Sequence, residues 1–243
     1  VSNGVIKFAT NDTERLRINA DGTIQTNTKS DGSVTSNVRF GVNAGDALTT
    51  GTGNVIIGDG AFSAEDTGSN HVAIGKSALA VLNVGGNSNV AVGLNALAAN
   101  VAGGNNTALG TNTLAAQNTS GGATDTNNTA VGNSAGTAVT SGQLNTFVGS
   151  SAGAGNQSSN NNTAIGAFAF DAGTGADNTA VGSGALGGGS NSGGENVAVG
   201  FEAGKTISSG QRNVIAGTLA ADALSTGQGN IAIGYDALGT EDT

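Results

Sequence analysis

The chain has 243 residues, of which 3% are aromatic and 10% charged, so it lacks the large side chains of an ordinary wide core. It contains no Cys, which excludes disulfides, thiolate nucleophiles and cysteine-ligated zinc. The formal net charge of −9 disfavours a phosphate backbone as partner, and no apolar run reaches the ~18 residues of a spanning helix. We therefore expect neither nucleic-acid binding nor membrane insertion. Because no Met is present, we expect a processed product or a fragment.

Residues 1–36 come first and lack the periodicity found further along the chain. They contain two runs with strand-like alternation, VIKFAT and RLRINADGTIQTNT. Asp21-Gly22 and Asp31-Gly32 are strong turn signals between such runs. The sequence predicts a small, non-repetitive N-terminal β segment that acts as a connector or cap before a repeat domain over 37–243.

From residue 37 onward a five-residue motif occurs twelve times: Asn, a β-branched residue, a usually small middle residue, a larger aliphatic and a closing glycine. The closing glycines are 17 residues apart in seven of eleven intervals, and 16, 18, 18 and 22 residues apart in the others. These structural repeat glycines are Gly41, Gly58, Gly75, Gly93, Gly110, Gly132, Gly149, Gly166, Gly182, Gly200, Gly217 and Gly234.

The second position of the motif is β-branched in all twelve copies, which favours a strand over a helix. One strand per fixed period predicts an all-β fold: a parallel β-solenoid, or β-roll, of about twelve ~17-residue coils stacked about 4.8 Å apart. Three residues after each closing glycine stands Ala, or Thr113 in one copy. We expect a second short strand to begin there, with surface loops over the rest of the period.

Side chains alternate across a strand, so the second and fourth positions share one face while Asn, the middle residue and glycine share the other. We expect the aliphatic face to line the coil and the small face to contact another chain closely. The few aliphatics of one coil return less free energy than the ordering of its residues costs. Burial of the small faces between chains would supply part of the difference, so we expect a homotrimeric rod.

Three irregularities carry further expectations. The Asn column forms either a hydrogen-bonded ladder or a series of turn residues, and the sequence does not choose between them. Arg39 occupies the middle position of the first copy, where a charge would cap the stack. Ile56, Phe147 and Ile215 also break the small-residue rule, and we expect local volume compensation around them.

The 22-residue interval adds about five residues, which solenoids place in a loop on one face. Such a loop serves either as a receptor contact or as tolerated slack. This candidate exposed loop comprises Ser120, Gly121, Gly122, Ala123, Thr124 and Asp125.

No constellation in the chain points to catalysis or to a cofactor. His71 is the only histidine and stands where other copies have Asn, so we interpret it as a substituted column residue. The acidic neighbours Glu65-Asp66 and Glu241-Asp242 have no aromatic cluster near them for sugar cleavage. The calcium-roll and phosphate-loop signatures are absent. We expect no catalytic residue, no metal, no cofactor and no enzymatic activity.

The string N-[TV]-A-[VIL]-G-x-x-A resembles the head repeat of trimeric autotransporter adhesins, which build a left-handed parallel β-roll trimer. It is still more similar to the NTAIG and NTAVG arrays of bacteriophage tail fibres, and TNDTERLRINADGTI over 10–24 looks like segments common in those fibres. The resemblance implies a trimer joined at its ends to other virion or surface-fibre proteins, on a virion or a cell surface. In that family a C-terminal chaperone often directs trimerisation and is then cleaved off.

The leading hypothesis is a structural fibre or shaft segment of a phage tail fibre or virion appendage that contributes to host-surface attachment. Any recognition of a host glycan or protein receptor falls to the variable loops. The alternative is a bacterial trimeric adhesin head, which a flanking membrane anchor would favour. A third hypothesis, an ice- or glycan-binding solenoid, rests on Thr at the second position of five copies. It ranks last because we expect those positions to point inward.

Overall fold

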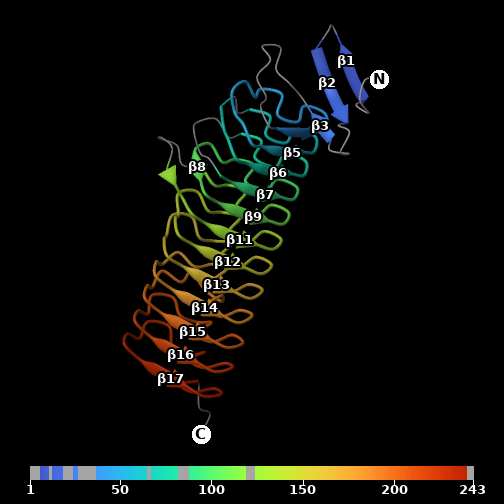
Figure 1. The fold of residues 1–243 in the computed structure, drawn as a ribbon. Helices are drawn as coiled ribbons and strands as arrows, with labels where there is room; N and C mark the ends of the chain where they lie inside the picture. The colour runs from blue at the N-terminus through green and yellow to red at the C-terminus, as the bar shows by residue number, and fades with distance from the viewer. Residues whose placement is uncertain are drawn as a thin grey trace.

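The computed structural model describes residues 6–10, 13–18, 24–26, 37–64, 67–81, 88–118 and 124–239. These residues form strands and turns, and none of them is helical. Most of them belong to one elongated stack of coils, which Figure 1 shows in side view. The all-β expectation is thus confirmed for the described part of the chain.

The N-terminal segment contains a three-stranded antiparallel sheet in the order β1-β2-β3. Its strands are β1 (Ile6–Thr10), β2 (Thr13–Ile18) and β3 (Ile24–Thr26). The two turn signals predicted at Asp21-Gly22 and Asp31-Gly32 lie outside the described residues.

Each copy of the motif forms one three-residue strand, and the twelve strands make a single sheet. The strand covers the second, middle and fourth positions, where the β-branched residue favours the extended backbone. In chain order the strands are β4 (Val38–Phe40), β5 (Val55–Ile57), β6 (Val72–Ile74), β7 (Val90–Val92), β9 (Thr107–Leu109), β11 (Thr129–Val131), β12 (Thr146–Val148), β13 (Thr163–Ile165), β14 (Thr179–Val181), β15 (Val197–Val199), β16 (Val214–Ala216) and β17 (Ile231–Ile233).

Neighbouring strands pair in parallel and in register, so each motif position stacks on the same position of the next coil. Thr129 pairs with Thr146 and Val131 with Val148, for example, and the same register holds from β4 to β17. The chain is therefore a parallel β-solenoid of about eleven turns between its first and last strands, with coils of about 17 residues. This confirms the predicted architecture.

The closing glycines lie where the strand turns away from the sheet. Their φ values run from +125° to +147°, a region that side chains rarely adopt. From Gly41 to Gly217, an added Cβ would lie 2.1–2.6 Å from the carbonyl group of the next closing glycine. Gly234, in the last coil, has the same backbone conformation but nothing within 4 Å of that position. Both the turn and the close stacking thus require glycine.

The second strand expected after each closing glycine does not form, and that prediction is wrong. The residues there make a turn in which the second and fourth residues after the glycine have positive φ, as in Ser77 (+57°) and Leu79 (+52°). The N–H groups of these two positive-φ residues point in opposite directions along the rod. Ser77 N–H donates to Asp59 C=O (3.0 Å) in the preceding coil, and Leu79 N–H to Ala96 C=O (3.0 Å) in the following one. These bonds hold Leu79 in a conformation that leucine otherwise avoids.

The two faces of each strand lie the opposite way round from the prediction. The middle residues, such as Ala73, are buried, together with the Ala three residues after the closing glycine. Leu or Phe at the next position, as in Leu79 and Phe170, fills the remaining interior. Because these side chains set the width of the coil, only a small residue fits at the middle of the strand. The aliphatics at the second and fourth positions therefore point outward.

The large middle residues compensate for glycines in the turn, which confirms that expectation. Phe147 occupies the space left by Gly136 and Gly153, because a Cβ on either glycine would lie 2.4–2.9 Å from its ring. The space that a glycine leaves empty in the turn is thus filled by the middle residue of the strand that faces it. The other pairs are Ile56 with Gly45 and Ile215 with Gly204.

The first coil ends the stack with a charged side chain. Arg39 stands at the inward-facing middle position of β4, and its Nε donates to the carbonyl of Ala44 at 2.9 Å. Arg39 pairs with Ile56 of the next coil in the sheet, and both side chains border the space beside Gly45. Arg39 thus stands in the terminal strand of the described sheet, and its role as a cap stays a prediction.

Candidate functional site

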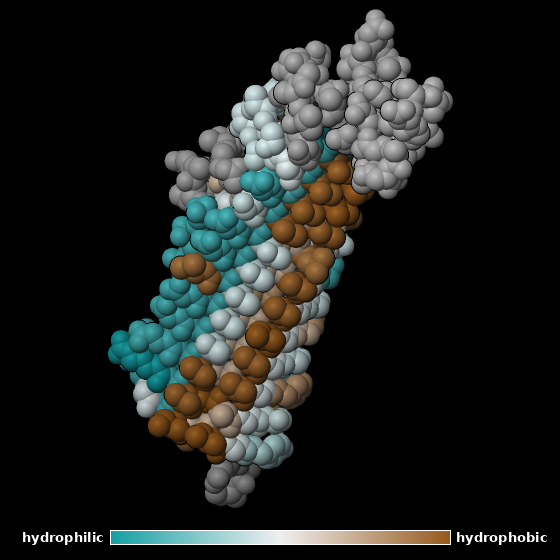
Figure 2. All heavy atoms as spheres, in the orientation of Figure 1, coloured by the Kyte–Doolittle hydropathy of each residue, from teal (hydrophilic) through white to brown (hydrophobic). Residues whose placement is uncertain are grey.

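The most extensive functional candidate is the outward face of the solenoid sheet, which we call the strand-face stripe. It consists of the second and fourth motif positions of every coil, in two parallel columns. Figure 2 shows its apolar residues as a continuous brown band along the rod. The second-position column is Val38, Val55, Val72, Val90, Thr107, Thr129, Thr146, Thr163, Thr179, Val197, Val214 and Ile231; the fourth-position column is Phe40, Ile57, Ile74, Val92, Leu109, Val131, Val148, Ile165, Val181, Val199, Ala216 and Ile233.

The side chains of the stripe are partly or fully exposed although most of them are aliphatic. Leu109 is 45% and Ile165 40% exposed, whereas the middle residues between the columns, Ala108 and Ala164, are 0% exposed. Twelve rungs at about 4.8 Å give the stripe a length of roughly 55 Å. Soluble monomers rarely expose a contiguous apolar band of this extent, so such a band marks an interaction surface.

The stripe has a chemically distinct middle section. In five consecutive coils of the motif, from β9 to β14, the second position is Thr and the fourth is Leu, Val or Ile. Toward both ends the second position is Val or Ile instead. A regular array of hydroxyl and methyl groups therefore occupies the centre of the face.

A ladder of Asn side chains flanks the stripe and holds the coils in register. Asn145 Nδ2 donates to Asn128 Oδ1 (3.1 Å), and the same oxygen accepts the backbone N–H of Asn145 (2.9 Å). Asn145 Nδ2 also donates to the carbonyl of Ser159, across its own coil (3.0 Å). The ladder interpretation of the Asn column is thus confirmed, and the same amide group also stabilises a turn by a hydrogen bond. In the 16-residue coil, Asn162 Nδ2 is buried without a partner.

His71 replaces Asn in this ladder, as predicted. Its backbone N–H donates to Asn54 Oδ1 (2.8 Å), and its Nδ1 accepts the N–H of Asn89 (3.2 Å). Its Nε2 is buried without a partner, and its ring lies 4.9 Å from that of Phe62. Burial lowers the pKa of His71 from 6.5 to about 4, because the cation loses its solvation.

The described end of the insertion loop rejoins the stack through a short two-stranded sheet. Residues 119–123, with Ser120, Gly121, Gly122 and Ala123, lie outside the described residues. Thr124 and Asp125 form β10 (Thr124–Asp125), which pairs in parallel with β8 (Gly103–Gly104). Asp125 is exposed. Behind β10, Thr126 Oγ1 donates to Asn106 Oδ1 (2.8 Å) and accepts from Gln117 Nε2 (2.5 Å), which fixes the base of the loop.

Charged groups are sparse among the described residues, and most of them lie at the surface. Within the described residues no three His, Asp or Glu side chains gather in a metal-binding arrangement. Lys76 pairs with Asp59 (3.8 Å), and burial raises the pKa of Asp171, whose Oδ1 has no partner. Glu65, Asp66, Glu241 and Asp242 lie outside the described residues. The part of the chain that is described contains no helix long and apolar enough to cross a membrane.

Comparison with family models, curated proteins and solved structures gave no match. The site therefore has to be interpreted from its own geometry. Sequence reasoning found the residues of the stripe but placed them inside the coil. One signal in the sequence pointed the other way: Ile56, Phe147 and Ile215 at the middle position each accompany a glycine four residues after a closing glycine. Such paired size changes indicate that the middle position faces the interior.

Proposed function

We propose that the chain is a structural shaft segment of a homotrimeric fibre, of the kind carried by a phage tail or virion appendage, and contributes to host-surface attachment. The observation that carries the proposal is the strand-face stripe, which runs the whole length of the stack. A second supporting observation is the resemblance of the repeats to tail-fibre arrays. Rods that bury this stripe against one another would form a stiff shaft, a role that needs no catalytic group.

The stripe suits association between parallel copies of the chain. Its columns run along the rod, so copies related by rotation about an axis parallel to the rod would bury it over its full length. Each rung then meets the equivalent rung of a neighbour, as closed rotational symmetry requires. Such burial removes apolar surface from water, which stabilises the assembly by about 25 cal/mol per Å² of apolar surface.

The presence of two columns favours three chains. In a cyclic trimer each chain contacts two neighbours through different surfaces, one on either side of the axis. The second-position column would meet one neighbour and the fourth-position column the other. The trimer contact thus uses the aliphatic face and not, as the sequence suggested, the small face, because the small residues are enclosed within each coil.

The mass of the protein in solution tests this proposal. The chain is 23.1 kDa, so sedimentation equilibrium at micromolar concentration should give about three times that mass. Leu109→Lys with Ile165→Lys, two outward-facing changes, should yield monomers that keep the circular dichroism of the wild-type solenoid. Leu144→Lys is the matched control, since Leu144 is 56% exposed but lies outside the stripe. A monomeric wild type would refute the proposal.

A bacterial surface adhesin head with the same architecture is the alternative within this class. The same surface would then serve the same trimer, so the mass does not separate the two. The full gene does: a membrane-anchor domain beside this segment favours the adhesin, and a virion-attachment or chaperone domain favours the fibre.

One observation favours a second candidate function, the binding of a flat, ordered lattice such as ice. Thr at the second position is partly or fully exposed in five consecutive coils, contrary to the expectation that ranked this hypothesis last. The face cannot be buried in a trimer and bind ice at once. Thermal hysteresis by a monomeric protein would support this candidate, and its absence would remove it.

A further inference from the structure

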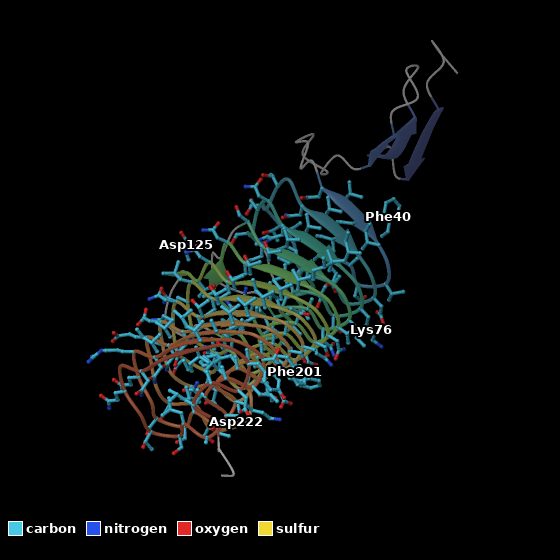
Figure 3. The ribbon with its side chains drawn as sticks, turned by 90° about the horizontal axis from the view of Figure 1, so that it is seen from below. Phe40, Lys76, Asp125, Phe201 and Asp222 are labelled. Atoms are coloured by element: carbon cyan, nitrogen blue, oxygen red, sulfur yellow. The ribbon has the colours of Figure 1, made fainter. Side chains whose placement is uncertain are left out.

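A column of aromatic side chains lies near the C-terminal end of the rod, apart from the strand-face stripe. Phe201 and Tyr235 each follow a closing glycine directly, and they are 50% and 76% exposed. Thr218 occupies the same position in the coil between them. Figure 3 shows Phe201 and Lys76, which share this position of the repeat, along one edge of the stack, with Asp125 on another side.

Backbone hydrogen bonds fix the spacing within this column. Leu219 N–H donates to the carbonyl of Phe201 (2.9 Å), and Asp236 N–H to the carbonyl of Thr218 (3.0 Å). The three coils are therefore stacked in register at this corner, one rung apart. Two rungs separate Phe201 from Tyr235, which corresponds to about 9.6 Å.

A carboxylate accompanies each aromatic ring. Glu202 follows Phe201 and Asp236 follows Tyr235, both with φ of +53°, while Leu219 takes that position in the coil between them. Glu202 also holds Lys205 through a 2.7 Å ion pair. The pairing of an aromatic with an acid thus repeats with a period of two rungs: Phe201 with Glu202, then Tyr235 with Asp236.

We propose that this column binds an extended, neutral, β-1,4-linked polysaccharide whose chain runs along the rod. In such a polymer each ring is turned by roughly half a rotation from the last, so every second ring presents the same face. The disaccharide that separates those rings is close in length to two rungs. Phe201 and Tyr235 would stack on alternate rings, since the flat C–H face of an equatorially substituted sugar packs against an aromatic π-face.

The charged groups select the class of glycan. Glu202 and Asp236 can accept hydrogen bonds from sugar hydroxyls, but with a net charge of −9 on the chain they disfavour uronic, sialic or phosphorylated polymers. Thr218, between the rings, is small enough to let the polymer pass over it. Glucose and N-acetylglucosamine polymers fit both requirements.

This inference deepens the proposed attachment role and rests on it for its biological purpose. Cellohexaose and chitohexaose are the probes, titrated calorimetrically into the intact protein, with α-linked maltohexaose as the curved control. We expect at least one β-linked probe to bind about tenfold more tightly than maltohexaose. Phe201→Ala and Tyr235→Ala should each weaken that binding by about tenfold. Phe168→Ala is the matched control, because Phe168 is 53% exposed but lies off the column.

The sharpest variant exchanges two residues of the column, Thr218→Tyr with Tyr235→Thr. It keeps the composition and places the aromatics one rung apart, so binding should be lost. Unchanged binding by this variant, or no binding of either β-linked probe by the wild type, would overturn the inference. A change of mass in Tyr235→Ala would overturn it too, because the ring would then be a subunit contact. Failure of glycan binding with an intact trimer leaves the proposed shaft unaffected.

Discussion

The inward and outward sides of the same twelve strands follow different chemical rules. Inside, every rung is constrained by its neighbours: Ala and Asn recur, and a large residue such as Phe147 appears only where a glycine makes room. On the outward side the residue type varies among Val, Thr, Ile, Leu and Phe from coil to coil, while the stacking of the strands stays the same. The comparison indicates that the inner face specifies the fold of one chain and that the outer face is free to specify what the rod contacts.

The largest effect should come from a closing glycine. Gly149→Ala combines a disfavoured φ of +136° with a Cβ 2.4 Å from the carbonyl oxygen of Gly166, so we expect a loss of about 5 kcal/mol or more in the stability of that region. Chemical denaturation and hydrogen exchange of the flanking coils measure it. Gly234→Ala separates the two causes, because Gly234 shares the conformation but has no neighbour. It should cost about 1–3 kcal/mol. Equal losses in the two variants would show that stacking is unimportant.

The next largest loss of stability should come from removing a large middle residue that fills the space beside a turn glycine. Phe147→Ala should destabilise by about 3–4 kcal/mol through the cavity it leaves. Gly153→Leu alone should also destabilise, because its side chain would overlap the ring of Phe147. Phe147→Ala combined with Gly153→Leu restores the pairing of a small middle residue with a turn leucine, as in Ala73 and Leu79. In a double-mutant cycle measured by denaturation, this variant should therefore recover much of the lost stability. Strictly additive losses would contradict volume compensation.

A third effect is the acid sensitivity of the ladder at one rung. The pKa of His71 is about 4 in the folded chain and near 6.5 when unfolded, so the unfolded chain binds more protons between these values. The free energy of unfolding is therefore at its full value above pH 6.5. It falls by roughly 3 kcal/mol as the pH is lowered toward 4, because only the unfolded chain takes up the proton. Denaturation midpoints at pH 7 and pH 4.5 measure the loss. His71→Asn restores the ladder residue and should reduce the pH dependence; an unchanged pH profile would show that His71 is not its source.

The smallest effect belongs to the surface ion pairs. Arg212 and Glu195 are in neighbouring coils, 3.1 Å apart, and both side chains are more than half exposed. Arg212→Gln should therefore change the denaturation midpoint by an amount equivalent to less than about 1 kcal/mol. A loss as large as that of Phe147→Ala would mean that the outer surface also specifies the fold.

The sequence was sufficient to predict the architecture but not the orientation of its faces. The period, the β-branched second position and the closing glycines predict one strand per coil in a parallel stack, because each is a local requirement of backbone geometry. Hydropathy then suggested that the aliphatics of Val131 and its equivalents lie inside. That inference failed because the interior is filled from the turn, by Leu79 and its equivalents. Leucine at positive φ has no signal in the sequence, so the pattern predicts a strand where the structure has a turn.

The site was predictable only in part for the same reason. The residues of the strand-face stripe were identified, but their exposure depends on the width of the coil, which only the three-dimensional structure gives. The column of Phe201 and Tyr235 was missed because aromatics are rare in the chain and their common phase, directly after a closing glycine, becomes meaningful only once the rungs are in register.

In the proposed trimer the outer strand face is buried between chains, while the inner face is buried within one chain. Thiol labelling tests it most directly, because the chain has no cysteine of its own. In the assembled protein, Ile165→Cys should react slowly with a maleimide, and Leu144→Cys, exposed but off the stripe, should react rapidly. Diluting the protein until it dissociates should bring the two rates together. If Ile165→Cys reacts as fast as Leu144→Cys in the assembled protein, the strand-face stripe is not the subunit contact.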